Sequence, residues 1–374
     1  MESPSHPPFP DDIPTHPLVV VDYARIVAED VAEVDKLWEA ATNLGFWYLK
    51  NHGVEEEANG MFDLGAATMA LPLEEKMRYE QGDDGSSFGY KARGSVATDA
   101  SGTQDTIEFI NISADDARSF PKVIHRSYPP PIQENFMERI AQPFVRKSTE
   151  VNTVLLAAFE KRLGLPDGAL AERHDVCENS GSEARVTYVK APASTDATSV
   201  MAQPSGKETL AIGAHTDFGS LSFLHNRLGG LQVLPPGTDQ WFYVRPIPGH
   251  AICNLGDAMA IFSGGILRSN IHRVVPPPGE QRKFDRWSLV FFTRPGDSVV
   301  LRALTDESPL IAKAVSDAQK DEASAAQASN VVKQFIETGE TAGEWFKRRI
   351  KNQRINNRKG PETWAASRGT EIRV

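Results

Sequence analysis

Residues 209–226, TLAIGAHTDFGSLSFLHN, contain the pattern that decides the fold. Two short apolar runs, TLAIG and SLSFL, stand on either side of a polar segment. The same texture extends from Arg185 to Pro295, where turns such as Leu228-Gly229-Gly230 separate the runs VTYV, TLAIG, SLSFL, LQVLP, WFYV, AICNLG, MAIFS, HRVVP and WSLVFF. Short strands at this spacing predict a sandwich or barrel, and about eight of them indicate a double-sheet jelly roll, also called a double-stranded β-helix.

The sequence before this core alternates strand-like and helix-like segments. Leu18 to Asp22 (LVVVD) is a β-branched run typical of a buried strand. From Glu29 to Leu44 apolar residues recur at helical spacing, and Gly45 is placed to end that helix. A second helical stretch runs from Glu134 to Leu163, where Pro143 is predicted to kink it. We therefore expect a mainly β core with flanking α-helices.

Shifts in composition divide the chain into five predicted parts. The first is rich in Pro, Asp and His, whereas the last is polar, helical and basic near its end. We expect a flexible leader (1–16), an N-terminal α/β region (17–130), a helical connection (131–180), the jelly-roll core (181–297) and a helical C-terminal extension (298–374) that is a candidate lid.

Composition and charge narrow the class of function. The 374 residues are 40% hydrophobic and 24% charged, which is ordinary for a globular protein. A formal charge of -10 disfavours a surface built to bind nucleic acid or anionic lipid. The sequence contains no run of about 18 apolar residues, which a membrane-spanning helix would need. Two cysteines without a CxxC pair disfavour zinc ribbons and disulfide frameworks. We expect a soluble, cytoplasmic protein that acts on a small molecule, with no nucleic acid, membrane or obligate protein partner.

His215-Thr216-Asp217 is the one H-x-[DE] triplet in the chain, although by itself it is no rarer than chance. In an extended segment residues i and i+2 project from the same face, so His215 and Asp217 can meet one ion. His272 lies in another strand-like run, SNIHRVV, which sheet pairing can bring to the same place. Two imidazoles and one carboxylate leave one face of a metal open, which suits non-haem Fe(II) oxygen chemistry. A structural zinc site would instead be closed by four ligands.

Arg286-Trp287-Ser288 is a second candidate binding motif. Arg286 and Ser288 share one face of a predicted strand, and a guanidinium beside a hydroxyl is suited to bind a carboxylate through charge-assisted hydrogen bonds. An isolated Arg-x-Ser is usually a surface feature. Together with the triad inside a predicted jelly roll, it predicts that a dicarboxylate spans from the metal to Arg286.

The segment Trp345 to Lys359 (WFKRRIKNQRINNRK) contains seven basic residues. Lys347, Lys351, Arg354 and Arg358 are spaced to share a helical face. We interpret this face as solvated, with contact to nucleic acid or a membrane as the alternative that the acidic chain disfavours.

The ordered motifs resemble the isopenicillin N synthase-like family of Fe(II)/2-oxoglutarate-dependent dioxygenases. PLVVVDYA followed by LGFWYLKNHGV is similar to the opening strand, helix and "GF..L.NHG" pattern of that family. The core is similar in GAHTDFGSLSFL, GGLQV, WFYVRPIPG, AICNLGDAMAIFSGG, SNIHRVV and RWSLVFFTRPG. The resemblance covers residues 17–297, and the order of the motifs makes it specific.

The resemblance implies a role for each candidate residue. His215, Asp217 and His272 would bind iron, and Arg286 and Ser288 would bind the distal carboxylate of 2-oxoglutarate.

Tyr188, in RVTYVKAP, falls where the family often has a tyrosine near the cosubstrate. Thr187 stands where many members have asparagine, and the Pro-Pro-Cys that often follows is absent. The resemblance therefore implies cosubstrate binding by Tyr188 on a partial match.

The implied activity is oxidation of an unactivated C–H bond of a small organic molecule by Fe(II), 2-oxoglutarate and O2, with release of succinate and CO2. Hydroxylation is the default outcome, and desaturation, demethylation or ring closure are the others. Phe218, Phe223 and Phe292 are candidates to line an apolar pocket, with packing in the core as the more common role for each, and they suggest an apolar or aromatic natural product as substrate. Two alternatives stay open: an iron oxidase of this fold that does not use 2-oxoglutarate, and a degenerate jelly-roll binding protein.

Overall fold

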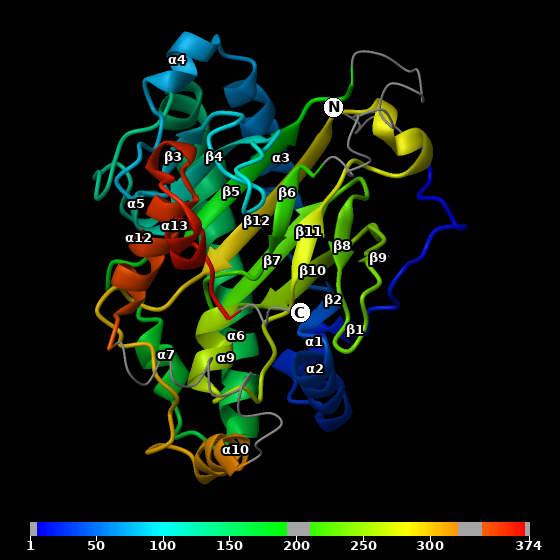
Figure 1. Cartoon of the computed structure of the whole chain (residues 1–374), viewed down its shortest axis with the longest axis vertical. Helices are drawn as coiled ribbons and strands as arrows, with labels where there is room; N and C mark the ends of the chain where they lie inside the picture. Colours follow the sequence, from blue (N-terminus) through cyan, green and yellow to red (C-terminus); the bar gives the residue numbers. More distant parts are fainter. Residues whose placement is uncertain (1–5, 193–209, 321–338, 371–374) are drawn as a thin grey trace.

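The computed structural model describes residues 6–192, 210–320 and 339–370 (Figure 1). Parts of the expected leader, core and C-terminal extension lie outside these residues. Within them, each helix is too short or too polar to cross a lipid bilayer.

Two sheets form the centre of the described structure. The larger has eight strands, and its neighbours are antiparallel except for the parallel pair at one edge. Their order is β1 (Val20–Asp22), β2 (Phe46–Lys50), β10 (His250–Leu255), β7 (Leu221–Asn226), β12 (Arg286–Thr293), β5 (Glu183–Val189), β4 (Glu108–Ser113) and β3 (Gly89–Lys91).

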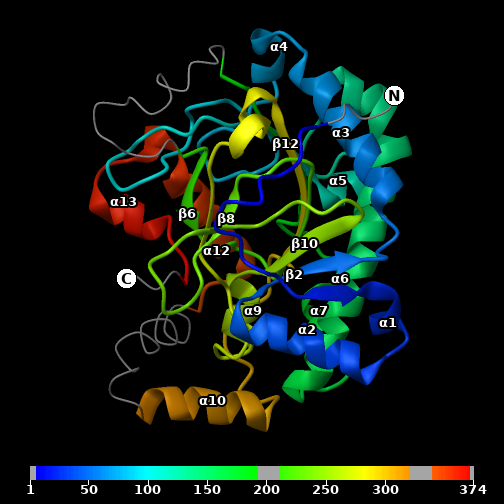
Figure 2. The ribbon, with the colours of Figure 1, turned by 90° about the vertical axis from the view of Figure 1, so that its right-hand side faces the viewer.

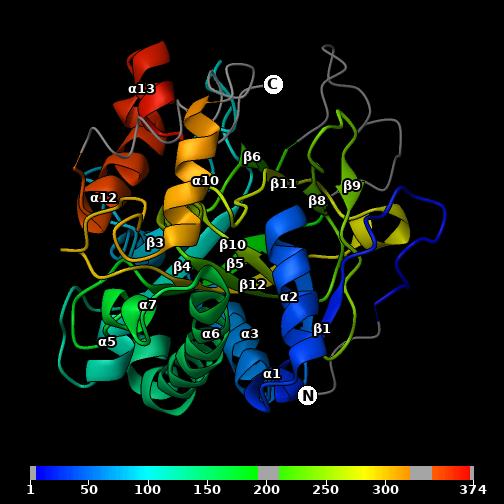
Figure 3. The same ribbon diagram turned by 90° about the horizontal axis from the view of Figure 1, so that it is seen from below.

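The smaller sheet has four antiparallel strands in the described residues. Their order is β6 (Ile212–His215), β11 (His272–Val274), β8 (Leu231–Val233) and β9 (Phe242–Tyr243). Figure 3 shows this sheet on one side of the larger sheet, with helices on the opposite side. The predicted mainly β core with flanking α-helices is confirmed.

One predicted strand is wrong. The run MAIFS lies in a buried helix, α9 (Asp257–Phe262), which follows β10 directly. A short apolar run is compatible with either a buried strand or a buried helix, and periodicity alone does not separate the two.

The helices before the core cover the far face of the larger sheet. The long helices α3 (Glu55–Met69) and α6 (Gln142–Leu163) pack directly on strands β5, β7 and β12 (Figure 3). The shorter elements are α1 (Tyr23–Val27), α2 (Val31–Asn43), α4 (Leu73–Met77), α5 (Ala114–Ser119), α7 (Ala169–Arg173) and the π-helix η1 (Ile132–Ala141).

The two helices predicted in this region are present. Asp30 caps the first by accepting a hydrogen bond from the Glu33 amide, and Gly45 follows its end with a φ of +76°. The hydrogen-bonding pattern of the second helix changes next to Pro143, because the π-helix ends at residue 141 and the proline occupies the first turn of α6. Ala141 and Gln142 both have helical φ and ψ, so the backbone stays helical from η1 into α6, and the kink itself stays a prediction.

Apart from one short 3-10 helix inside the core, the remaining described segments lie toward the two ends of the chain. Residues 6–16 run along the smaller sheet, where Thr15 bridges to Tyr243 and the Pro7 carbonyl accepts a hydrogen bond from Gln281. The C-terminal region contains α10 (Pro309–Lys320), α12 (Ala342–Gln353), the 3-10 helix η3 (Ile355–Asn357) and α13 (Pro361–Ala366), and a further 3-10 helix, η2 (Gly279–Lys283), precedes β12.

The two faces of strand β7 have different surroundings: one packs in the hydrophobic core and the other lines a cavity. Leu221 and Phe223 are buried in the main hydrophobic core with the residues of α3 and α6. Ser222 and Leu224, one position along, line a cavity between the two sheets. This alternation follows from the period of two in a strand.

Candidate active site

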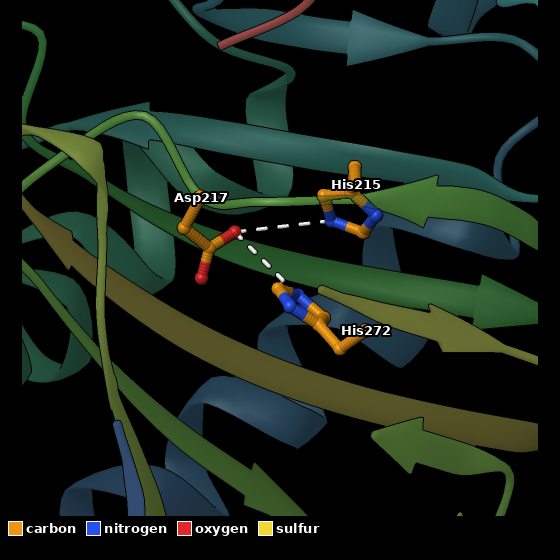
Figure 4. A group of neighbouring side chains, drawn as sticks. All are labelled: His215, Asp217 and His272. Atoms are coloured by element: carbon orange, nitrogen blue, oxygen red, sulfur yellow. Dashed lines mark ion pairs between the residues drawn. The ribbon is translucent and has the colours of Figure 1, made fainter. Parts of the chain in front are cut away.

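His215, Asp217 and His272 converge at one end of the cavity between the sheets (Figure 4). β6 ends at His215 and β11 begins at His272, and these two residues are paired directly across the smaller sheet. Their ring centroids lie 4.3 Å apart. The Nε2 atoms of His215 and His272 lie 3.8 Å and 3.7 Å from Asp217 Oδ1. The three candidate ligand atoms therefore face one point, as the strand geometry predicts.

Hydrogen bonds orient both imidazoles toward that point. The Nδ1 atom of His215 lies 2.8 Å from the Gly213 carbonyl, and that of His272 lies 3.2 Å from the Asn270 carbonyl. A carbonyl accepts hydrogen bonds only, so each Nδ1 carries the proton and each Nε2 keeps a free lone pair. This arrangement is common for metal-binding histidines.

The carboxylate of Asp217 is held in the same way. Its Oδ2 accepts hydrogen bonds from the Ser222 hydroxyl at 2.5 Å and the Asn254 amide at 2.7 Å. Its Oδ1 is left facing the two histidines. Sequence reasoning missed Ser222 and Asn254, although SLSFL and AICNLG were recognised as strands.

Electrostatics at neutral pH favour a divalent cation here. Burial, reinforced by His272, lowers the pKa of His215 to about 3. Burial alone would raise the pKa of Asp217, but the two imidazoles and the bonds from Asn254 and Ser222 lower it to about 2. A neutral imidazole and an ionised carboxylate are the forms that bind a metal.

The donor set fits a metal site with open positions. Among the described residues, the group that could hold an ion consists of two histidines and one aspartate, with ligand atoms within 4.8 Å of one another. No fourth protein ligand from the described residues closes it, unlike a structural zinc site. The chemistry of the donors matches non-haem iron(II).

Arg286 and Ser288 line the same cavity from β12 in the larger sheet. The Arg286 side chain is only 3% exposed; its Nε donates to the Gly229 carbonyl at 2.8 Å and its Nη1 to the Ser288 hydroxyl at 3.3 Å. Burial lowers its pKa to about 10, and no carboxylate of the described residues pairs with it. A buried guanidinium without a counterion is costly, so this position favours an anionic ligand.

The cavity has a volume of about 170 Å³. Phe218 and Phe292 line it as expected, whereas Phe223 is fully buried in the core on the other face of β7. Phe223 therefore takes the alternative role of core packing, since the face it occupies points toward the helices. Phe46 and Phe109 add further aromatic surface.

Tyr188 is not brought into the cavity by the described structure. It pairs with Trp287 across β5 and β12 and stacks on that ring, while its hydroxyl donates to Asp285 at 2.8 Å. Thr187, which pairs with Ser288, lines the cavity instead. Because neighbouring residues of a strand point to opposite faces, Thr187 and Tyr188 cannot both face the cosubstrate.

The C-terminal region, which the sequence predicts as a candidate lid, supplies a wall of the cavity, although sequence reasoning did not name the residues that form this wall. Ile350, Gln353, Arg354 and Arg368 line it together with the candidate metal ligands. The basic segment is solvated only in part, because Arg354 is buried and ion-paired with Glu80 and Asp83.

Two family models match this chain, one in its N-terminal region and one in its jelly-roll core. The model of the 2OG-Fe(II) oxygenase superfamily matches residues 185–295, and the model described as the N-terminal part of non-haem dioxygenase in morphine synthesis matches residues 18–133. A 2-oxoglutarate-dependent dioxygenase of Aspergillus fumigatus is 30% identical over 339 residues, covering 83% of each chain. Another, from Dothideomycetidae sp., is 30% identical over 294 residues, covering 77% of this chain and 84% of its own.

Solved structures share the fold. A full-length protein of Neurospora crassa, in complex with α-KG and thymine, superposes with a TM-score of 0.68 at 20% identity over 89% of this chain and 96% of its own. JOX2, in complex with 2OG, iron and JA, superposes with a TM-score of 0.58 at 21% identity over 82% and 84% of the two chains. With a jelly-roll core, a facing His-Asp-His group and relatives that align along most of their length, the chain belongs to the 2OG-Fe(II) oxygenase superfamily and is a 2-oxoglutarate-dependent dioxygenase.

Proposed function

We propose that His215, Asp217 and His272 bind Fe(II), and that Arg286 and Ser288 bind the distal carboxylate of 2-oxoglutarate. The observation that carries this proposal is one cavity holding three convergent metal-binding atoms and a buried guanidinium without a carboxylate partner among the described residues. An ion and a dicarboxylate together would satisfy both groups.

The side chains of the site have distinct tasks in this scheme. Bound iron and 2-oxoglutarate supply the oxidation of a C–H bond, with O2 consumed and succinate and CO2 released. Gly213 and Asn270 fix the two imidazoles through their carbonyls, and Ser222 and Asn254 fix the carboxylate. Their hydrogen bonds preorganise the ligands, so binding of the ion costs little rearrangement.

We propose a small, apolar or aromatic molecule as the substrate. Rings of Phe46, Phe109, Phe218 and Phe292 line the cavity, and apolar surface dominates most small-molecule sites. Structural neighbours were solved with thymine and with JA, which are small molecules. Binding of nucleic acid, a membrane or an obligate protein partner is not part of this proposal, and the cytoplasmic location stays a prediction.

The test is succinate formation from 2-oxoglutarate in air, measured with and without Fe(II) across a panel of candidate aromatic and aliphatic compounds. The proposal expects iron-dependent turnover that a subset of compounds stimulates, with an oxidised product visible by mass spectrometry. O2 consumption that needs iron but not 2-oxoglutarate would instead identify an oxidase of the same fold. Purified protein that binds no iron under anaerobic loading would point to a degenerate binding protein.

A further inference from the structure

The C-terminal arm, defined as residues 342–370, packs on the short segment that carries two of the candidate metal ligands. This ligand segment comprises residues 214–218. In the view of Figure 2, α12 and α13 of the arm overlap the region of β6; more than a hundred residues separate them in the chain, yet residues of the arm and of β6 line one cavity. The position of the arm therefore bears directly on the metal site.

The arm contacts the ligand segment at both of its ends. The guanidinium of Arg368 donates to the Ala214 carbonyl at 2.5 Å. The guanidinium of Arg349 lies over the ring of Phe218, 3.6 Å from its centroid. Ala214 precedes His215 and Phe218 follows Asp217, so the arm contacts the residues that bracket the H-x-D motif.

Asp257 connects the arm to the middle of the same segment. Its amide donates to the Asp217 carbonyl at 2.8 Å, and its carboxylate accepts a hydrogen bond from the Thr216 hydroxyl at 3.2 Å. The same carboxylate forms an ion pair with Arg349 and accepts a hydrogen bond from the hydroxyl of Thr370. One carboxylate thus joins α9, the ligand segment and two points of the arm.

This junction is tightly packed. The side chains of Asp257 and Arg349 are both fully buried. A Cβ atom on Gly369 would overlap both Asp257 Oδ2 and Arg349 Nη1, so a side chain there would displace the ion pair. Breaking a buried pair by removing one partner leaves an uncompensated charge, which strongly disfavours the packed state.

We propose that Asp257 is a positioning residue through which the C-terminal arm fixes the main chain of the ligand segment, so that arm packing and metal binding stabilise each other. The inference rests on the proposed iron ligation by His215 and Asp217. If the packed arm raises metal affinity by some factor, the metal must favour the packed arm by the same factor. The arm also lines the cavity. Metal binding would therefore also favour the position of the arm in which it forms this wall of the cavity.

The first test measures binding of Mn²⁺ by calorimetry in the presence of 2-oxoglutarate, which avoids iron oxidation. Arg349→Met keeps the apolar stem of the side chain but removes the charge that Asp257 needs, and we expect at least tenfold weaker Mn²⁺ binding. Arg349→Lys, which keeps a cation, should recover part of the loss. Lys351→Met is the matched control, because Lys351 is exposed on the same helix. The Lys351→Met protein should bind Mn²⁺ with the affinity of the wild type. A folded Arg349→Met protein with wild-type Mn²⁺ affinity would overturn the proposal.

The second test needs no variant, so it decides the matter even if Arg349→Met does not fold. Hydrogen exchange of the wild-type protein, with and without Mn²⁺ and 2-oxoglutarate, should slow in residues 342–370 as well as in residues 214–218. Protection confined to the ligand segment would overturn the link while leaving the metal site intact. Absence of any Mn²⁺ binding by the wild type would overturn the proposed function itself, and this inference with it.

Discussion

Replacing Arg286 by methionine should affect stability and cosubstrate binding in opposite directions. In the cosubstrate-free protein Arg286 is a buried cation without a carboxylate partner among the described residues, so removing it relieves a cost. In the complex with 2-oxoglutarate, the same change leaves the distal carboxylate without its counterion. Methionine keeps much of the side-chain volume and isolates the effect of the charge.

The magnitudes follow from the environment of the side chain. Burial lowers the pKa of Arg286 from 12.5 to about 10, which corresponds to about 3 kcal/mol against the charged form in the folded protein. Loss of the donor to the Gly229 carbonyl offsets about 1–3 kcal/mol of that gain. The free energy of unfolding without cosubstrate should therefore be equal to that of the wild type or up to about 2 kcal/mol higher.

Binding of 2-oxoglutarate should weaken far more. Truncating one partner of a buried charge pair costs about 2–5 kcal/mol, which is about 30-fold to 4,000-fold in affinity. Denaturant unfolding gives the first quantity, and calorimetry with Mn²⁺ and 2-oxoglutarate gives the second. Ser288→Ala is the companion variant, for which loss of one hydrogen bond predicts about 1 kcal/mol, or roughly fivefold weaker binding.

Two results would refute this reasoning. Wild-type affinity for 2-oxoglutarate in Arg286→Met would show that the carboxylate binds elsewhere. A fall in the unfolding free energy of more than about 3 kcal/mol would show that the protein itself provides the counterion.

Three further predictions concern described residues that do not line the cavity. Tyr188→Phe should leave the KM for 2-oxoglutarate unchanged, because its hydroxyl bonds to Asp285 rather than facing the cavity; a tenfold increase in KM would contradict this. Phe223→Ala should lower the unfolding free energy by about 3–5 kcal/mol in denaturant titrations without changing which compounds are oxidised, since that ring belongs to the core. The hydrogen bond to Asp115 raises the pKa of His125, so its contribution to stability is complete below the unfolded pKa and is lost as the pH rises through the folded value. The stability difference between wild type and His125→Gln should therefore shrink as the pH rises above the unfolded pKa of 6.5, and a growing difference would show the sign to be wrong.

The central residues of the site can be predicted from the sequence, because the spacing of residues within a strand determines which side chains share a face. His215 with Asp217, and Arg286 with Ser288, are each two residues apart, so an extended backbone places each pair on one face. The pairing of His272 with His215 required the family pattern, since nothing in SNIHRVV specifies its partner strand.

The features that sequence reasoning missed depend on contacts between distant segments. Tyr188 was assigned by its position in a motif, whereas the pairing of β5 with β12 turns it away from Ser288. The ion pair of Asp257 with Arg349 joins residues 92 apart, and neither has a local pattern that identifies the other. A basic helix can be exposed to solvent or packed against the protein. The sequence does not tell these two cases apart, and here the structure buries Arg349 and Arg354 of this segment.

The central claim is that one iron ion binds to His215, Asp217 and His272. It is tested most directly by the iron content of anaerobically loaded protein after removal of free metal, compared between the wild type and Asp217→Asn. The asparagine keeps the size of the side chain and its contact with Ser222 and Asn254 but removes the charge. We predict one Fe(II) per wild-type chain and almost none in the variant, with succinate formation lost in parallel. A folded variant that retains stoichiometric iron and wild-type succinate formation would contradict the account.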